Sequence, residues 1–215
     1  MIRGLAGRAR ALCAGPGRAI LGITGAPGAG KTTLVEQLLA TLLDDPPPGC
    51  EPGSWVAHVP MDGFHLADVQ LERLGLRDRK GAPETFDSGG NLATLRRIRH
   101  EPSAIVYVPG FERHLEQPIA ASIAVQPAAR LVITEGNYLL LSTGVWPFVR
   151  AELDEVWYVD AADDERVGRL VRRHVEFGKT PDAAMESVLR SDEANAALVA
   201  ASRPRADLVL SAADL

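Results

Sequence analysis

The stretch that decides the fold is Gly25-Ala26-Pro27-Gly28-Ala29-Gly30-Lys31-Thr32, in the first fifth of a chain of 215 residues. It satisfies the pattern G-x-x-x-x-G-K-[ST], in which glycines let the backbone turn tightly and point successive N–H groups at one anion. An apolar run, Ala19 to Thr24, precedes it, and a helix-period run, Lys31 to Leu43, follows it. The sequence therefore predicts a strand, a phosphate-binding loop and a helix in this order.

The same motif assigns roles to its residues. We expect Lys31 to reach the β- and γ-phosphates of ATP and the Thr32 hydroxyl to bind Mg²⁺. The alternative is a glycine-rich turn that only caps a helix, and it is disfavoured because every fixed position and both flanks agree with the motif. The residues expected to bind the nucleotide here are Gly25, Ala26, Pro27, Gly28, Ala29, Gly30, Lys31, Thr32 and Thr33.

Apolar runs of strand length alternate with helix-period segments along the rest of the chain. This alternation is typical of βαβ units, in which helices cover both faces of a parallel sheet. The expected strands are Ala19–Thr24, Trp55–Met61, Ala104–Val108, Leu131–Thr134, Glu155–Val159 and Leu208–Ser211, with Pro118–Val125 as a weaker edge strand. The expected helices are Lys31–Leu43, Val69–Gly75, Leu92–His100, Asp164–Phe177 and Pro181–Ala201, with a short amphipathic helix within residues 1–18. Arg77 to Gly90 is polar and lacks a period, so we expect an ordered functional loop there.

Composition excludes several classes of protein. With 23 Lys and Arg against 28 Asp and Glu, the net charge is −5, which does not supply the dense basic surface that nucleic acids need. No apolar run approaches the roughly 20 residues that cross a bilayer, so we expect no membrane partner. The two cysteines, Cys13 and Cys50, have no partner at metal-ligand or disulfide spacing, which fits a cytoplasmic protein. A single domain over residues 1–215 is predicted.

A phosphate-binding loop alone permits kinases, ATPases, GTPase switches and metallochaperones, so other residues must decide. Asp87-Ser88-Gly89-Gly90 matches the D-x-x-G of a GTPase switch, but no buried strand precedes it and the chain has no N-K-x-D to read guanine. A metallochaperone is disfavoured because there is no Cys/His cluster. A small-molecule kinase remains the favoured hypothesis.

Two acidic residues follow predicted strands. Asp62 comes at the end of the second strand. In an open parallel sheet, ligands bind beyond the carboxyl ends of the strands, so Asp62 would face the same crevice as the phosphate-binding loop. Its carboxylate could there deprotonate an attacking hydroxyl. Glu135 follows the strand Leu131–Thr134, where an acid beside the phosphate-binding strand holds Mg²⁺ directly or through water. The plainer alternatives are a helix N-cap for Asp62 and a solvated strand end for Glu135.

With the phosphate-binding loop, Met61-Asp62-Gly63-Phe64-His65 and Thr134-Glu135-Gly136 in this order, the chain resembles the uridine kinase, phosphoribulokinase and pantothenate kinase superfamily. The resemblance runs from about Ala19 to the C-terminus. Residues 79–87, 108–113 and 202–207 make it closest to small bacterial kinases of the nucleoside/nucleotide and fructose-transport types. It implies a P-loop NTPase fold: a three-layer α/β/α domain with a mostly parallel central sheet and a helical lid.

The resemblance also implies an activity and further site residues. The expected reaction is transfer of the γ-phosphoryl group of ATP to a hydroxyl of a sugar-like or nucleoside-like metabolite. Asp62 matches the family's catalytic base, Glu135 its acid near Mg²⁺ and Asp87 an aspartate that binds sugar hydroxyls. Tyr107, Arg113 and His114 fall in the segment that lines the acceptor pocket. Uridine kinases have Y-D-F followed by a histidine where this chain has Tyr107-Val108-Pro109-Gly110-Phe111, which is a departure from that pattern.

Arginines gather in the predicted helix 164–177, and steps of three and four residues put Arg166, Arg169 and Arg173 near one face. This segment resembles the family's lid, about residues 163–180, whose arginines close over ATP. We expect Arg166 and Arg169 to bind ATP, and Arg169 and Arg173 to act in catalysis beside Lys31 and Asp62. The alternative is a solvated basic face that pairs with neighbouring acids.

Three further residues are acceptor-binding candidates with structural alternatives of similar weight. His65 could hydrogen-bond a polar acceptor, and Arg79 and Lys80, with Arg113, could clamp an anionic substituent. Uridine, cytidine or pantothenate remain alternative acceptors, and a nucleotide-dependent regulatory protein or metallochaperone is the alternative from another class. A homodimer is left open beside a monomer.

Overall fold

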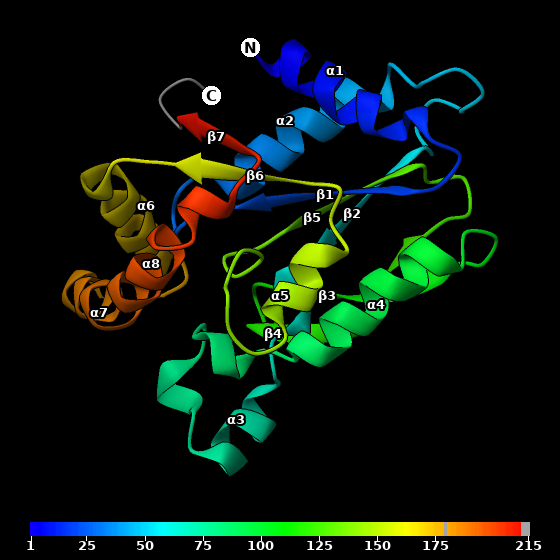
Figure 1. The fold of residues 1–215 in the computed structure, drawn as a ribbon. Coiled ribbons are helices and arrows are strands. Elements are labelled where there is room, and N and C mark those ends of the chain that lie inside the picture. Colours follow the sequence, from blue (N-terminus) through cyan, green and yellow to red (C-terminus); the bar gives the residue numbers. More distant parts are fainter. Residues whose placement is uncertain (179, 212–215) are drawn as a thin grey trace.

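A five-stranded parallel sheet runs through the centre of the computed structural model, which describes residues 1–178 and 180–211 (Figure 1). Lys179, inside the predicted lid, and residues 212–215 lie outside the described residues. The strand order is β2 (Val56–Pro60), β5 (Leu131–Glu135), β1 (Ala19–Thr24), β6 (Glu155–Asp160) and β7 (Leu208–Ser211). Every residue of β1 and β5 is buried, as expected for central strands covered on both faces.

Alternate residues of the central strands feed two separate cores. On one face, Leu21 and Ile23 pack with the apolar side of α2 (Lys31–Leu43), over which α1 (Ile2–Ala11) lies. On the other face, Ile20 belongs to a core shared with α4 (Ser88–His100) and α5 (Trp146–Ala151). The three-layer α/β/α fold predicted from the sequence is confirmed, and so is the mostly parallel central sheet.

The predicted strand Ala104–Val108 is not a strand of the central sheet. It corresponds to β3 (Val106–Glu112), which pairs antiparallel with β4 (Gln117–Val125) in a separate two-stranded sheet. The prediction of a parallel strand was wrong because β3 alternates between buried and exposed residues, with Tyr107 turned outward, whereas parallel strands are covered on both faces. The weaker expectation of a strand over Pro118–Val125 is confirmed.

The helical segments differ from the sequence prediction at three places. Arg77 to Gly90 is not irregular throughout: it contains 3₁₀ turns at Arg77–Arg79 and Pro83–Thr85, and α4 begins at Ser88. The short helix α5 was missed. The helix predicted over Pro181–Ala201 consists of α7 (Pro181–Ser187), a π-helical turn (Val188–Asp192) and α8 (Glu193–Ala200).

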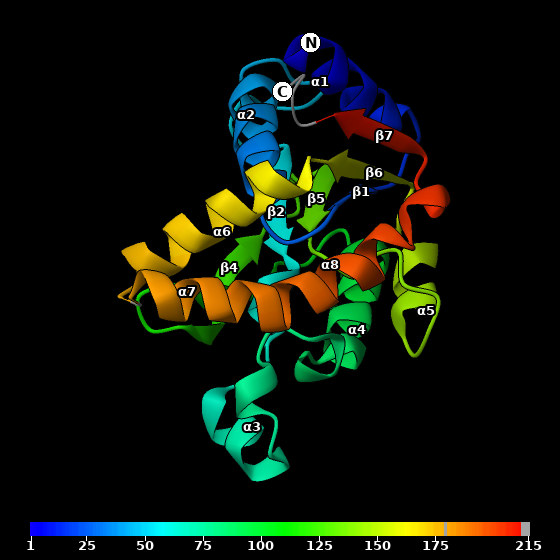
Figure 2. The same cartoon turned by 90° about the vertical axis from the view of Figure 1, so that its left-hand side faces the viewer.

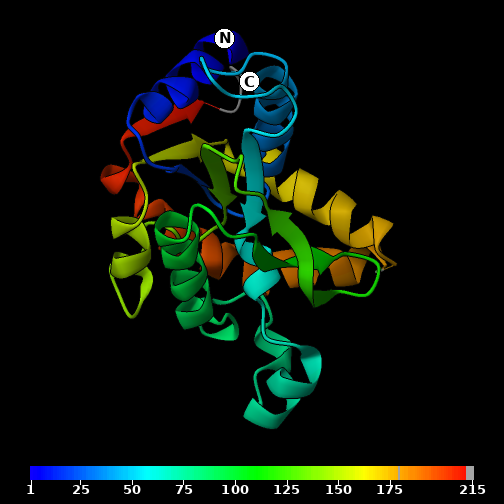
Figure 3. The ribbon, with the colours of Figure 1, turned by 90° about the vertical axis from the view of Figure 1, so that its right-hand side faces the viewer.

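Figure 2 shows where these pieces lie relative to the sheet. Helix α6 (Asp163–Glu176) and the α7–α8 arm extend side by side from the edge of the sheet that carries the carboxyl ends of the strands. From the opposite side, Figure 3 shows the β3–β4 hairpin next to β2, and α3 (Asp68–Leu74) projecting below it. The P-loop, the hairpin and the two helical arms all contribute residues to one cavity. None of the helices described is long and apolar enough to span a membrane.

Candidate active site

The loop between β1 and α2 wraps around a buried lysine. Lys31 Nζ donates to the carbonyl oxygens of Gly25 at 3.0 Å and Ala26 at 3.1 Å, so the side chain is held across the loop. Burial lowers the pKa of Lys31 to about 8, against the opposing effect of Glu135 and Asp62. An added anion beside Lys31 would favour its charged form, which is the electrostatic property a phosphate site needs.

Helix α6 packs directly on this loop. Gly28 has φ +79, and a Cβ there would lie 2.7 Å from the Arg166 carbonyl oxygen, so only glycine allows this approach. Arg166 is 2% exposed and donates from Nη1 to the Pro27 carbonyl at 3.3 Å and from Nη2 to Glu193 Oε1 at 2.6 Å. The arginine therefore joins the phosphate-binding loop to α8.

Thr32 and Glu135 meet where β1 and β5 end side by side. The Thr32 hydroxyl donates to Glu135 Oε1 at 3.1 Å, with Oε2 at 3.3 Å. Burial raises the pKa of Glu135, and the nearby negative charge of Asp62 raises it further. A buried carboxylate whose charged form is disfavoured, next to a hydroxyl, fits a divalent cation. Mg²⁺ in particular takes few protein oxygens and keeps waters and substrate phosphates as its other ligands.

Asp62 lies one strand further along the same edge. Because β2 pairs with β5 in the register Pro60 to Glu135, the residues that follow the two strands emerge together. A Cβ on Gly136 would lie 2.6 Å from Met61 Sδ, so the two chain segments are in direct contact there. The Asp62 carboxylate does not cap a helix, since α3 has Ala67 at its N-cap position. It is half-buried, and Arg113 Nη2 lies 3.6 Å from its Oδ2.

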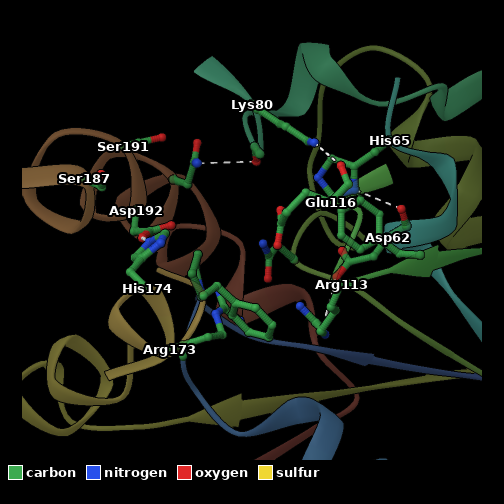
Figure 4. Close-up of a pocket in the computed structure, with 18 of the residues that line it drawn as sticks. Asp62, His65, Lys80, Arg113, Glu116, Arg173, His174, Ser187, Ser191 and Asp192 are labelled. Atoms are coloured by element: carbon green, nitrogen blue, oxygen red, sulfur yellow. Dashed lines mark hydrogen bonds and ion pairs between the residues drawn. The ribbon is translucent and has the colours of Figure 1, made fainter. Parts of the chain in front are cut away.

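These groups face one cavity of about 520 Å³ (Figure 4). In Figure 4, Asp62, His65 and Arg113 lie on one side of it, and Arg173, His174 and Asp192 lie on the other. The lining residues come from the P-loop, the ends of β2 and β5, the loop before α4, the hairpin tip and the two helical arms. They include Lys31, Thr32, Asp62, His65, Arg77, Lys80, Phe111, Arg113, Glu116, Glu135, Asn137, Arg173, His174, Arg190, Ser191, Asp192 and Asn195.

The sequence profile of the Phosphoribulokinase / Uridine kinase family matches residues 20–214. The chain belongs to this family of kinases.

Individual relatives agree with the family. The chain is 30% identical over 200 residues to the "Putative uridine kinase C227.14" of Schizosaccharomyces pombe, covering 90% of this chain and 83% of that protein. It is 35% identical over 145 residues to the "ATP-dependent kinase-like protein notR'" of Aspergillus versicolor, covering 63% of this chain and 84% of the relative. The structure of a "putative fructose transport system kinase" from Silicibacter sp. TM1040 superposes with a TM-score of 0.86, at 36% identity and 98% coverage of both chains.

Ten of the residues that the sequence analysis selected in this kinase line the cavity, Pro27 and Gly28 of the P-loop among them. Lys31, Thr32, Glu135 and Asp62 gather at its floor, and His65, Lys80, Arg113 and Arg173 line its walls. His65 Nδ1 lies 2.9 Å from the Asp62 carbonyl oxygen, and burial lowers the pKa of its ring. Arg169 contacts the P-loop from outside the cavity, with Nη1 3.4 Å from the carbonyl oxygens of both Gly28 and Ala29.

Arg166 and several P-loop residues also lie outside the cavity lining, and so do four of the residues selected for binding the acceptor. Asp87 is the N-cap of α4, where its Oδ1 accepts the Gly90 N–H at 2.7 Å. Arg79 forms an ion pair with Glu84 at 2.5 Å, and Tyr107 is 59% exposed on the outer face of β3. The ring of His114 lies 6.3 Å from that of Phe177, so this residue joins the hairpin tip to the end of α6.

Sequence reasoning missed the wall formed by the π-helical turn. Its Arg190, Ser191 and Asp192 line the cavity, and Asp192 Oδ2 lies 3.1 Å from His174 Nε2 on α6. A π-helical turn inserts one residue into a helix and often marks a functional site, but a helical periodicity of 3.6 does not reveal it. Arg77, rather than Arg79, is the arginine of its loop that faces the cavity.

Proposed function

We propose that this kinase transfers the γ-phosphoryl group of ATP, bound with Mg²⁺, to a hydroxyl of a sugar-like or nucleoside-like metabolite. The observation that carries the proposal is the convergence of Lys31, the Thr32–Glu135 pair and the Asp62 carboxylate on one cavity floor. Each of these groups has a separate role in phosphoryl transfer, and their spacing lets one donor and one acceptor bind side by side.

The donor half of the site binds the triphosphate. Backbone N–H groups of the P-loop and the N-terminus of α2 surround the β- and γ-phosphates, and Lys31 adds a positive charge. Thr32 and Glu135 would hold Mg²⁺. When bound, the cation neutralises charge that develops on the phosphate oxygens. Thr33, exposed in the first turn of α2, lies beside this site.

The acceptor half activates the hydroxyl. In the proposed step, the hydroxyl oxygen attacks the γ-phosphorus, its proton passes to the Asp62 carboxylate, and the bond to the β–γ bridging oxygen breaks to release ADP. The Arg113 guanidinium, 3.6 Å from Asp62 Oδ2, would hold the carboxylate in place and contact polar groups of the acceptor.

Helix α6 supplies positively charged arginines to the phosphate side of the cavity. Arg166 and Arg169 already contact carbonyl oxygens of the P-loop, which anchors the base of α6. Arg173, two turns beyond Arg166, lines the cavity, and it is the arginine we assign to the transferred phosphoryl group. Residues 163–180 would then act as the lid, and closure would exclude water from the reacting groups.

The residues that line the cavity and the names of the relatives support the proposed acceptor class. Lys80, Arg113, Ser191 and Asp192 offer ionic and hydrogen-bonding groups suited to a hydroxyl-rich metabolite. Relatives named for uridine and for fructose transport support a nucleoside or a sugar as the acceptor. Arg77, Lys80 and Arg113 together would suit an acceptor that carries an anionic group.

A coupled assay of ATP turnover tests the proposal. The panel would contain uridine, cytidine, pantothenate, free sugars and sugar phosphates, with Lys31→Ala as the blank. We expect one of these to raise ATP turnover in the wild-type protein and not in the blank. Stimulation by a protein or a metal ion instead of a metabolite would support the regulatory or metallochaperone alternative.

With the acceptor identified, Asp62→Asn tests the base. We expect kcat to fall by about 10²–10⁴-fold, the usual contribution of a general base, with the Kd for Mg·ATP unchanged. Asp44→Asn, on the exposed end of α2 and outside the cavity, is the matched control. Unchanged turnover in Asp62→Asn would remove Asp62 from the mechanism.

A further inference from the structure

The β3–β4 hairpin touches the segment 61–65 through the backbone of β3 at Pro109 and through the side chain of Phe111. The Pro109 carbonyl lies against Gly63, where an added Cβ would come within 2.6 Å of the carbonyl carbon. The ring of Phe111 lies 4.9 Å from the ring of His65. The backbone and a side chain of β3 therefore both lie against this segment.

The first residue after β3 adds a contact at Asp62. Arg113 follows the end of β3, and its guanidinium lies 3.6 Å from the Asp62 carboxylate. The position of Asp62 relative to the cavity is therefore set on two sides: by the end of β2 and by the backbone of β3. Any shift of Pro109 along the hairpin would move Gly63, and Asp62 with it.

An irregularity in β4 fixes the backbone of β3 at this point. Val108 pairs with Ile123 and Gly110 pairs with Ile119, so three residues of β4 face the single residue Pro109. Proline has no N–H and cannot continue a ladder of hydrogen bonds, and the two extra residues of β4 form a bulge opposite it. Within the bulge, Ala121 adopts φ +55.

Ser122 closes the bulge with its side chain. The N–H of Gly110 donates to Ser122 Oγ at 2.8 Å in a partly buried hydrogen bond. A side-chain hydroxyl thus takes the place of a strand carbonyl immediately after Pro109, whose own carbonyl contacts Gly63. Without that hydroxyl the Gly110 N–H would lose its acceptor, and the Pro109–Gly110 peptide would no longer be held against the catalytic segment.

We propose that Ser122 is a positioning residue for Asp62: through Gly110 and Pro109, its hydroxyl holds Gly63 and the neighbouring carboxylate in place for proton transfer. The proposal rests on the proposed role of Asp62 as the base. It gives the β4 bulge a catalytic purpose, although Ser122 itself is exposed and does not line the cavity. A displacement of about 1 Å at a reacting group can lower the rate by up to about 10²-fold. Loss of the single hydrogen bond between Ser122 and Gly110 could therefore lower the rate, although Ser122 is remote from the reacting atoms.

The test compares Ser122→Ala with Ser122→Thr, which keeps the hydroxyl. Ser54→Ala is the matched control, because Ser54 Oγ also makes one hydrogen bond near the surface, to the Glu51 carbonyl, far from the cavity. Two readouts are used: kcat and KM with the acceptor found in the turnover screen, and hydrogen exchange of the amides of residues 61–65 in the Mg·ADP complex. The second readout does not depend on an acceptor.

We expect Ser122→Ala to lower kcat by about tenfold while the KM for ATP and the melting temperature stay near the wild-type values. Exchange of the amides at 61–65 should quicken, exchange in α2 should not change, and Ser122→Thr should restore both properties. A wild-type kcat in Ser122→Ala would overturn the proposal, and so would an equal loss of ATP binding and melting temperature, which indicates general unfolding. If Asp62→Asn is itself fully active, the base assignment fails, and this result is distinct from a failure of Ser122→Ala alone.

Discussion

The phosphate side and the acceptor side of the cavity are built in opposite ways. The phosphate side uses consecutive residues and backbone groups, and its left-handed conformations fall on glycines such as Gly28 and Gly30. The acceptor side joins side chains from distant segments, and the only non-glycine residues with positive φ in the described chain, Glu116 and Ala121, lie in its hairpin. The first is a local property of sequence, whereas the second depends on the whole fold.

The two sides also differ in whether their charged side chains already form ion pairs. Lys31 is buried and its hydrogen bonds go to carbonyl oxygens, while Glu135 and Asp62 act on it without forming an ion pair that the described residues show. On the acceptor side the ionic groups are already paired: Arg113 with Asp62 and Lys80 with Asp68 at 2.7 Å. A ligand therefore completes the phosphate side but must exchange existing ion pairs on the acceptor side. Substitutions should have correspondingly unequal effects.

The largest effect is expected for Lys31→Met. Loss of the ammonium group should reduce ATP turnover by about 10²–10³-fold or more, because it removes a preorganised charge at the transferred phosphate. The nucleotide-free protein should not be destabilised, since methionine fills a similar volume without the cost of a buried, uncompensated charge. Steady-state turnover and thermal unfolding measure the two properties. A variant that unfolds at a much lower temperature would contradict the second expectation.

A smaller effect is expected on the acceptor side, from Arg113→Gln. Loss of a charge-assisted contact of about 1.5–3 kcal/mol should raise the KM for the acceptor by about 10–100-fold and leave the KM for ATP unchanged. Arg79→Gln is the matched control, because Arg79 pairs with Glu84 and does not line the cavity. Equal effects of the two substitutions would show that the acceptor binds elsewhere.

This contrast also explains how far the sequence could predict the molecule. The P-loop, its flanking strand and helix, and the acids at Asp62 and Glu135 could be predicted because each depends on neighbouring residues and on parallel strands ending at one edge. The capping role of Asp87 was missed, because the predicted helix began at Leu92 rather than Ser88 and the family resemblance favoured a ligand role. Residue identity alone could not distinguish Arg77 from Arg79, since a 3₁₀ turn decides which one faces the cavity.

The hairpin was the least predictable part. Ala104 to Val108 is a short apolar run, and no neighbouring residue indicates that its partner is Gln117–Val125 or that the pairing contains a bulge. Likewise, the contact between His174 and Asp192 joins residues on two helical arms and needs the π-helical turn. Long-range pairing, rather than propensity, decides both features.

An effect of intermediate size is expected for the pH dependence of Mg·ATP binding, through Lys31 on the phosphate side. With a pKa of about 8 in the free protein, Lys31 loses its proton above pH 8, whereas bound phosphates should raise that pKa. Mg·ATP binding should then take up a proton between pH 8 and 9.5, and affinity should fall by about tenfold per pH unit above the free pKa. Calorimetric titrations in buffers of different ionisation enthalpy measure this uptake, and Lys31→Met should abolish it.

The smallest effect concerns strain in the acceptor-side hairpin. Ala121 has φ +55, a conformation that costs an L-residue about 1–2 kcal/mol and that a β-branched side chain adopts still less readily. Ala121→Gly relieves the strain but loses up to about 1 kcal/mol in chain entropy, so its unfolding free energy should equal or slightly exceed that of the wild type. Ala121→Val should be less stable than either. Denaturant unfolding ranks the three proteins. If the valine variant matched the wild type, residue 121 would not be left-handed in solution, and the bulge that presents Ser122 to Gly110 would have a different geometry.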